Sequence, residues 1–316
     1  MPVGTGLLSQ LGWGLEVTPG TAVVATAWAD GLRSESLKIE QEWMISQALR
    51  AGRRTQRTRV AGTRKISGNV EVEVSSGSIG MLLRQSVGAE AISGIGPYNH
   101  TFTPTTAVEV PSTTVEVGRP SLDGTVRRFR YVGAKVDQWE LSQDVDEFLI
   151  MSVDYMGMTE DLTGAMSTPT YTTVQPFTFV NATLTLGGSA ECFSSLKISG
   201  KNNISSTNLV CATDPRAPKV RDPGFHELGG SFEQEFEDMT LYNLFVAGTP
   251  ATFGAIWSAG STSILEIAGQ VMYDGETPNV TGPDVLMQSV PFSFIHATAD
   301  ASAFTATLTN SVATVS

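Results

Sequence analysis

The chain has 316 residues, a formal net charge of −12 and two cysteines, Cys192 and Cys211. This acidic balance argues against a basic nucleic-acid-binding protein, and two cysteines are too few for a disulfide framework, so we expect both to be free thiols. The start of the chain lacks the pattern of a signal peptide, and no run of about 18 apolar residues predicts a membrane helix. Abundant Gly, Ser, Thr and Val instead predict a β-rich protein that folds in the cytosol.

The first predicted elements are two strands and a helix. Apolar and charged residues alternate over residues 37–43 and again over 69–74, where Glu71 and Glu73 share one face and valines the other. A stripe of Ile79, Leu82 and Leu83 that ends at Val87 then predicts a short helix. Further strands are expected over 113–117, 127–141 and 148–155.

A basic segment separates the first two predicted strands, and no acidic residue occurs from position 44 to position 69. Its members are Arg50, Arg53, Arg54, Arg57, Arg59, Arg64 and Lys65. Such a segment can be a solvated mobile loop or a nucleic-acid patch. Because the rest of the chain is acidic, a positive arm that docks on another copy of the chain is electrostatically favoured.

The second half of the chain begins after a Ser-, Thr- and Pro-rich stretch at 163–175, which is typical of a linker. A long stretch at 202–227 precedes a predicted strand at 231–236, in which Glu233 and Glu235 again share one face. A short helix from Leu241 is expected to end at Gly248. Strands are predicted over 252–257, 264–273 and 285–295.

Three sequence blocks occur twice, in the same order. Residues 36–39 match 195–198, residues 68–74 match 230–236, and residues 147–155 match 284–292. The offset falls from 162 (230 minus 68) to 137 (284 minus 147), so the first copy carries a longer insertion. These repeats predict two tandem copies of one fold, residues 1–163 and 164–316. Each copy is expected to be all-β, a sandwich or barrel with one short helix.

Residues that carry catalytic or metal chemistry are not arranged in any known pattern. The chain has no phosphate-binding loop and no nucleophile elbow, and His100, His226 and His296 are isolated from one another and from cysteine. Asp144 and Asp146 lie in a predicted turn, where a solvated hairpin is favoured over a calcium site. The sequence therefore predicts a protein that is not an enzyme, with no catalytic, metal or cofactor site.

Four segments resemble the siphophage tail tube (major tail) proteins, and together they extend over nearly the whole chain. They are residues 12–22, 49–54, 117–120 and 282–292. The resemblance implies a virion protein, assembled in the host cytoplasm, whose rings stack into a tube that conducts double-stranded DNA during ejection. In relatives with a duplicated fold, three chains form one ring with pseudo-sixfold symmetry. The implied partners are further copies of the chain and the tape measure, tail terminator and tail tip proteins, with no cofactor and no membrane.

Within such a tube, two groups of residues acquire expected roles. The basic segment is expected to reach a neighbouring subunit or ring. Glu71, Glu73, Glu233 and Glu235 are expected to line the lumen, because basic wall residues would bind phosphate; the alternative is that these glutamates face outer solvent. If each copy supplies four barrel strands, six copies give a backbone diameter of at least about 37 Å, wide enough for duplex DNA.

Two alternative functions remain at the level of the sequence. One is another ring component of a phage tail, at the tail tip or connector. The other is a β-sandwich binding module, for example for carbohydrate, which should expose a cluster of aromatic side chains. The five tryptophans are instead scattered, mostly within predicted strands, at Trp13, Trp28, Trp43, Trp139 and Trp257.

Overall fold

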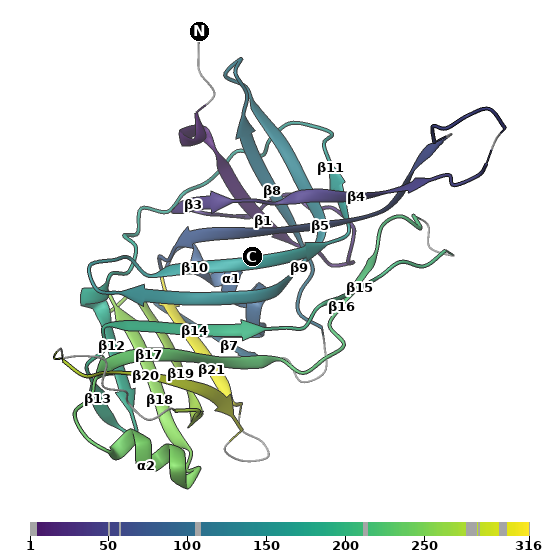
Figure 1. Cartoon of the computed structure of the whole chain (residues 1–316). Coiled ribbons are helices and arrows are strands. Elements are labelled where there is room, and N and C mark those ends of the chain that lie inside the picture. Colours follow the sequence, from purple (N-terminus) through teal and green to yellow (C-terminus); the bar gives the residue numbers. More distant parts are fainter. Residues whose placement is uncertain are drawn as a thin grey trace.

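The computed structural model describes residues 5–49, 51–56, 58–104, 109–210, 214–275, 283, 285–296 and 302–315. It consists of antiparallel strands with two short α-helices, so the predicted all-β fold class is confirmed (Figure 1). The first half contains β1 (Gln10–Leu15), β2 (Ala27–Trp28), β3 (Leu32–Glu35), β4 (Lys38–Ile45), β5 (Arg59–Glu73), α1 (Ile79–Val87), β6 (Gly88–Ser93), β7 (Tyr98–Pro104), β8 (Thr113–Pro120), β9 (Val126–Asp144), β10 (Ile150–Gly157) and β11 (Thr159–Asp161). The second half contains β12 (Ala182–Leu186), β13 (Ser189–Glu191), β14 (Ser195–Lys201), β15 (Ser205–Thr207), β16 (Lys219–Arg221), β17 (Glu227–Glu235), α2 (Thr240–Ala247), β18 (Ala251–Ser258), β19 (Ile264–Tyr273), β20 (Met287–Ile295) and β21 (Phe304–Asn310). Short 3-10 turns occur at Gly6–Leu8 and Phe179–Asn181.

The predicted helices and the predicted later strands of both halves are confirmed. The stripe from Ile79 to Val87 forms α1, and Gly248 ends α2 with a φ of 58°, the left-handed conformation that glycine adopts at low cost. Asp144 is the last residue of β9, and Asp146, with a φ of 64°, lies in the turn that follows it.

One layer of the molecule is a sheet to which both halves contribute, which we call the long sheet. Its strand order is β4–β5–β10–β9–β14–β17–β20. The two halves meet at β9 and β14, where Ser195 to Lys201 pair with Asp144 to Gln138. The long sheet crosses the middle of the molecule in Figure 1 as a stack of strands.

Most of the remaining strands form the second layer, whereas β3 pairs with β5 of the long sheet and β15 and β16 form a separate ribbon. In the first half β9 bends out of the long sheet to pair with β8 and β11, and β8 pairs with β1. In the second half β19 pairs with β18 and β21, and β18 pairs with β12. The order β1–β8–β9–β10–β5–β4 thus matches β12–β18–β19–β20–β17–β14, which is what a tandem duplication of one fold would produce. The additional hairpin β6–β7 lies in the first half, where the offsets of the repeats predict an insertion, and it pairs with β21.

The main hydrophobic core of the described residues lies between the layers and includes residues of both halves. Trp139 of β9 packs against Phe304 of β21, with ring centroids 5.9 Å apart. Leu141 on β9 and Ile198 on β14 are both buried at the junction of the halves. Because burial of apolar surface is the main stabilising term in folding, we expect the halves to unfold together rather than as separate domains.

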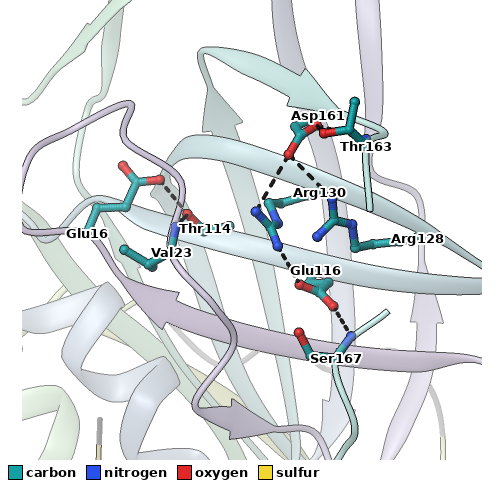
Figure 2. A network of polar contacts seen from close by, with 9 residues as sticks. All are labelled: Glu16, Val23, Thr114, Glu116, Arg128, Arg130, Asp161, Thr163 and Ser167. Carbon is teal, nitrogen blue, oxygen red and sulfur yellow. Dashed lines mark hydrogen bonds and ion pairs between the residues drawn. The ribbon is translucent and has the colours of Figure 1, made fainter. Parts of the chain in front are cut away.

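The predicted linker is an extended strap held against the first half (Figure 2). Buried Glu116 accepts a hydrogen bond from the Ser167 N–H at 2.6 Å and faces Arg130 at 3.6 Å. Arg130 and Arg128 both reach the Asp161 carboxylate, at 3.6 and 3.5 Å. The Thr163 hydroxyl donates to Asp161 and is the main cause of the lowered pKa of this carboxyl. The strap is therefore anchored by charge-assisted contacts along its first part.

Candidate functional site

A two-stranded ribbon, residues 41–64, projects from the body of the molecule, and we call it the arm (Figure 1). The pairing of β5 with β10 ends at Ile66, whereas its pairing with β4 continues to Arg59. The far part of the arm therefore has no third strand among the described residues. An isolated ribbon of this kind is marginally stable by itself, so a contact with another surface would stabilise it.

The basic residues of the arm lie in three different environments. Arg53 and Arg54 are exposed near the tip, whereas the Arg59 guanidinium stacks over the Trp43 ring at 4.1 Å. Arg64 pairs with Asp214 and Lys65 with Glu40, at 2.5 and 3.5 Å. Arg50 and Arg57 lie outside the described residues.

The prediction of one continuous basic loop is wrong for three of these residues. Arg59, Arg64 and Lys65 belong to β5. The physical reason is that a projecting ribbon has no core side, so its sequence lacks the apolar alternation that identifies a strand. Its basic tip, with Arg53 and Arg54, remains available for a contact with another molecule.

The arm also carries apolar side chains that the sequence analysis missed. Its exposed apolar residues are Trp43, Met44, Ile45, Leu49 and Val60. An apolar patch of this kind on a projecting element is typical of a protein–protein interaction site, because each square ångström kept in water costs about 25 cal/mol relative to burial. The basic tip of the arm and its exposed apolar side chains are together complementary to a partner surface that is acidic and partly apolar.

The corresponding ribbon of the second half, β15–β16, supports the base of the arm. Asp214 in its loop binds Arg64, and the Arg216 carbonyl accepts a hydrogen bond from the Arg64 N–H at 2.8 Å. The Ile204 N–H donates to Asp137 at 2.8 Å, which ties the same ribbon to β9. The direction of the arm is thus set by contacts between the two halves.

All four predicted lumen glutamates lie on one face of the long sheet. One row of directly opposed residues crosses the sheet. It runs from Glu71 through Ser152, Glu140 and Ser199 to Gly229. Directly opposed residues share a face, and so do alternate residues along one strand. Glu73 therefore lies on the same face as Glu71, and Glu233 and Glu235 lie on the same face as Gly229.

This surface, the acidic face, is mainly polar and carries more carboxylates than amines. Its carboxylates include Glu71, Glu73, Glu140, Asp144, Asp154, Glu227, Glu233 and Glu235, and its lysines near the middle are Lys197 and Lys201. Arg33 of β3 reaches Glu71 at 3.2 Å. The opposite side of the same strands is apolar, with Val70, Val72 and Phe232 buried.

A hollow of about 540 Å³ lies in the acidic face where the two halves meet. Residues of five strands line it: Gln138, Trp139, Glu140, Ser152, Asp154, Ser199, Gly200, Lys201, Glu227, Leu228, Gly229 and Ser293. The hollow shows that this part of the acidic face is concave. The hollow is lined by strands of both halves of the chain.

The family of the chain follows from comparison with known proteins. A family described as "Phage tail tube protein" matches residues 6–294. The chain belongs to this family of phage tail tube proteins. The expected resemblance is therefore confirmed, and it places the protein in the tail of a virion. No curated protein matches the chain.

The opening segment of this tail tube protein is organised by Glu16. Its carboxylate accepts hydrogen bonds from the N–H groups of Gly20 and Gly133 and from the hydroxyls of Ser112 and Thr114, all at 2.7–2.8 Å (Figure 2 shows the contact with Thr114). One side chain thus joins the loop after β1 to β8 and to β9. The segment attracts notice in the sequence only for its resemblance, and this role leaves no local pattern, since three of the four donors lie more than 90 residues away.

We expect Glu16→Gln to destabilise the fold by about 2–4 kcal/mol, because the amide nitrogen cannot accept the bonds of two of these donors. Urea unfolding followed by tryptophan fluorescence measures this difference. Glu42→Gln, on the exposed edge of β4, is the matched control and should leave the midpoint unchanged. An unchanged midpoint for Glu16→Gln would contradict the assigned role.

Sites for other chemistry are not evident in the described part of the chain. There, no group of three or more His, Cys, Asp and Glu side chains is placed to hold a metal ion. His100 is buried between Glu90 and the Val312 carbonyl, at 2.9 and 2.8 Å, and His226 contacts Asp222. Neither helix described has the length and apolarity needed to cross a membrane. Cys192 is an exposed free thiol, whereas Cys211 lies outside the described residues.

Proposed function

We propose that this tail tube protein is the ring-forming subunit of the tube and has no enzymatic activity. In this proposal three chains close into a pseudo-hexameric ring, and the acidic face lines a lumen through which double-stranded DNA passes. The observation that supports it best is the long sheet, in which strands of both halves form one surface with Glu71, Glu73, Glu233 and Glu235 on the same side.

The number of strands agrees with the dimensions that such a lumen needs. The first half supplies β4, β5, β10 and β9, and the second half supplies β14, β17, β20 and the end of β19. Twenty-four strands from three chains, about 4.8 Å apart, give a backbone diameter of at least about 37 Å. Duplex DNA would fit inside such a barrel once side chains are added.

The tryptophans argue against a carbohydrate-binding module. Trp13, Trp28, Trp139 and Trp257 are buried, so they form no aromatic binding surface. Only Trp43 is exposed, and it belongs to the arm. The arm would connect successive rings or subunits, and tape measure, tail terminator and tail tip proteins would contact the ends and lumen of the tube.

We expect native mass spectrometry to find a species of about 101 kDa, three times the 33.6 kDa chain. The reason is that two fold copies per chain require three chains for a sixfold arrangement. Negative-stain microscopy of the same sample should show rings or tubes. A ring of six full chains, or monomers at every concentration, would refute the proposed assembly.

A further inference from the structure

The two helices occupy matching places in the fold but differ in burial. α1 follows β5 and α2 follows β17, and these strands carry the same sequence block. Eight of the nine residues of α1 are buried, whereas Leu241 is the buried residue of α2. Val246 on α2 is 64% exposed, and Phe245 is exposed beside it. An apolar helix surface that is covered in one copy and bare in the other indicates a missing neighbour.

α1 is covered by β6, β7 and β9 of its own half and, in addition, by residues of the second half of the chain. The Val315 and Leu308 side chains lie against Gly80, where a Cβ atom would clash with Val315. The Asn202 side-chain amide donates to the Ser86 carbonyl at the end of α1, at 3.0 Å. The Asn310 amide donates to the Ser76 carbonyl just before α1, at 2.8 Å. Part of the environment of α1 is therefore a contact between the two halves of the chain.

The long sheet shows the same difference between covered and open positions. β14 pairs with β17 on one side and with β9 of the other copy on its second side. β4 has the position of β14 in its own copy and continues the same four-residue block, yet β5 is its one partner strand among the described residues. An unpaired strand edge of this kind is a template for a strand of another chain.

The open edge of β4 is held in place by its own chain only at its beginning. The Leu37 carbonyl, just before β4, accepts hydrogen bonds from Arg119 at 2.6 Å and from the Tyr131 hydroxyl at 2.8 Å. Arg119 in turn binds Glu35 through two hydrogen bonds, at 2.8 and 2.7 Å. Beyond Leu37 no such contact covers the edge in the described structure, so pairing with another chain can start there.

We propose that the junction between the two halves is repeated between chains, so that β4 and Trp43 of one copy dock on the second half of the next copy and cover its α2. This inference rests on the proposed ring and adds the residues that close it. Residues 36 and 195 begin the repeated block with an offset of 159, and the same offset relates Trp43 to Asn202. Asn202 contacts the end of α1, so Trp43, 46% exposed, takes the equivalent place beside Phe245 and Val246 of the neighbour.

The occupant of α2 is a second copy of this chain because the internal junction already shows the complementary surface. The contact is heterologous, joining a first half to a second half, and a heterologous contact closes into a ring when its rotation allows. A symmetric dimer would instead place α2 against α2. The heterologous contact brings β4 of one chain to α2 of the next, whereas the symmetric dimer brings α2 to α2, and cross-linking can distinguish the two.

The substitution Val246→Asp tests the inference. It should leave the chain folded, with an unchanged melting temperature, because Val246 is largely exposed within the chain. It should abolish the three-chain species in native mass spectrometry, because a carboxylate would be buried against Trp43 of the neighbour. Leu122→Asp, at an exposed apolar position in the β8–β9 turn, is the control and should leave ring formation intact. Rings formed by Val246→Asp as readily as by the natural chain would overturn the inference.

Cross-linking distinguishes failure of this inference from failure of the proposed ring. Ile45→Cys and Val246→Cys are combined in a background with Cys192→Ser and Cys211→Ser, and a short bismaleimide is added. Covalent species should end at three chains, and each single-cysteine variant should remain uncross-linked. Rings without cross-links in the double variant, or cross-linking of Val246→Cys alone, would overturn the inference while the ring stands. Absence of rings from the natural chain would remove the proposed function itself.

Discussion

The double substitution Arg53→Glu/Arg54→Glu should abolish tube growth while each chain remains folded. Both arginines are exposed near the tip of the arm, far from the core, so reversing their charge should disturb few contacts within the chain. Between rings the effect is large, because an acidic tip would face a neighbour that is itself acidic, with a net charge of −12 per chain. Like charges placed directly opposite each other at an interface cost several kcal/mol.

Negative-stain microscopy measures the length of tubes, and circular dichroism with thermal melting checks the fold. Arg127→Glu is the control, since Arg127 is an exposed arginine on the β8–β9 hairpin, paired with Asp123. It should leave tube growth unchanged. Growth of the natural protein should also decrease as salt is raised, because exposed charges are screened within about 8 Å at physiological ionic strength. Normal tubes from the arm variant would refute a docking role for its tip.

Local patterns in the sequence were sufficient to predict both α-helices and several of the longer strands. Alternation in the segment that ends β5 places Val70 and Val72 in the core and Glu71 and Glu73 on the other face, because one side of that strand is buried. The helix stripe from Ile79 and the glycine after α2 were equally informative. These signals depend on contacts within a few residues of one another, which a single sequence contains.

Features that depend on distant contacts could not be predicted. The first part of β5, from Arg59 to Lys65, lacks a buried side and so has no alternation to recognise. The pairing of β9 with β14 joins the two halves of the chain and leaves no local trace in either strand. The sequence also gave no sign that α1 is buried and α2 exposed, since both helices have similar apolar stripes and differ only in what covers them.

The candidate site was predicted in its residue types more than in its geometry. The basic tip with Arg53 and Arg54 and the common face of the four glutamates followed from charge and alternation. The exposed Trp43, Met44 and Val60 were not identified, because apolar residues in a strand are normally read as core. The arm is therefore better understood as an apolar and basic ribbon than as a basic loop.

Lysines introduced on the acidic face should convert the tube into a strong binder of linear DNA. In the variant Glu73→Lys/Glu233→Lys/Glu235→Lys, each three-chain ring gains nine lysines in the proposed lumen, three from each chain. Glu71 is left in place because it pairs with Arg33. Each phosphate contact contributes about 0.9 to the slope of log affinity against log salt, so binding should be tight at low salt and steeply salt-dependent. The natural tube, with carboxylates at these positions, should bind no DNA at the same salt.

The shape of the DNA decides whether these residues face the lumen. A short linear duplex can enter the tube from its end, whereas a covalently closed plasmid cannot thread it. Sedimentation of tubes with each DNA should therefore show that the acidic-face variant retains the linear duplex and leaves the plasmid in solution. Glu266→Lys is the matched control, because Glu266 on β19 alternates with buried Leu265 and Ile267 and points out of the second layer. If this control retains DNA at all, the DNA should be bound on the outer surface of the tube, so the plasmid should be retained as well as the linear duplex. Binding of the plasmid by the acidic-face variant would place these glutamates on the outside of the tube and contradict an electrostatically repulsive lumen.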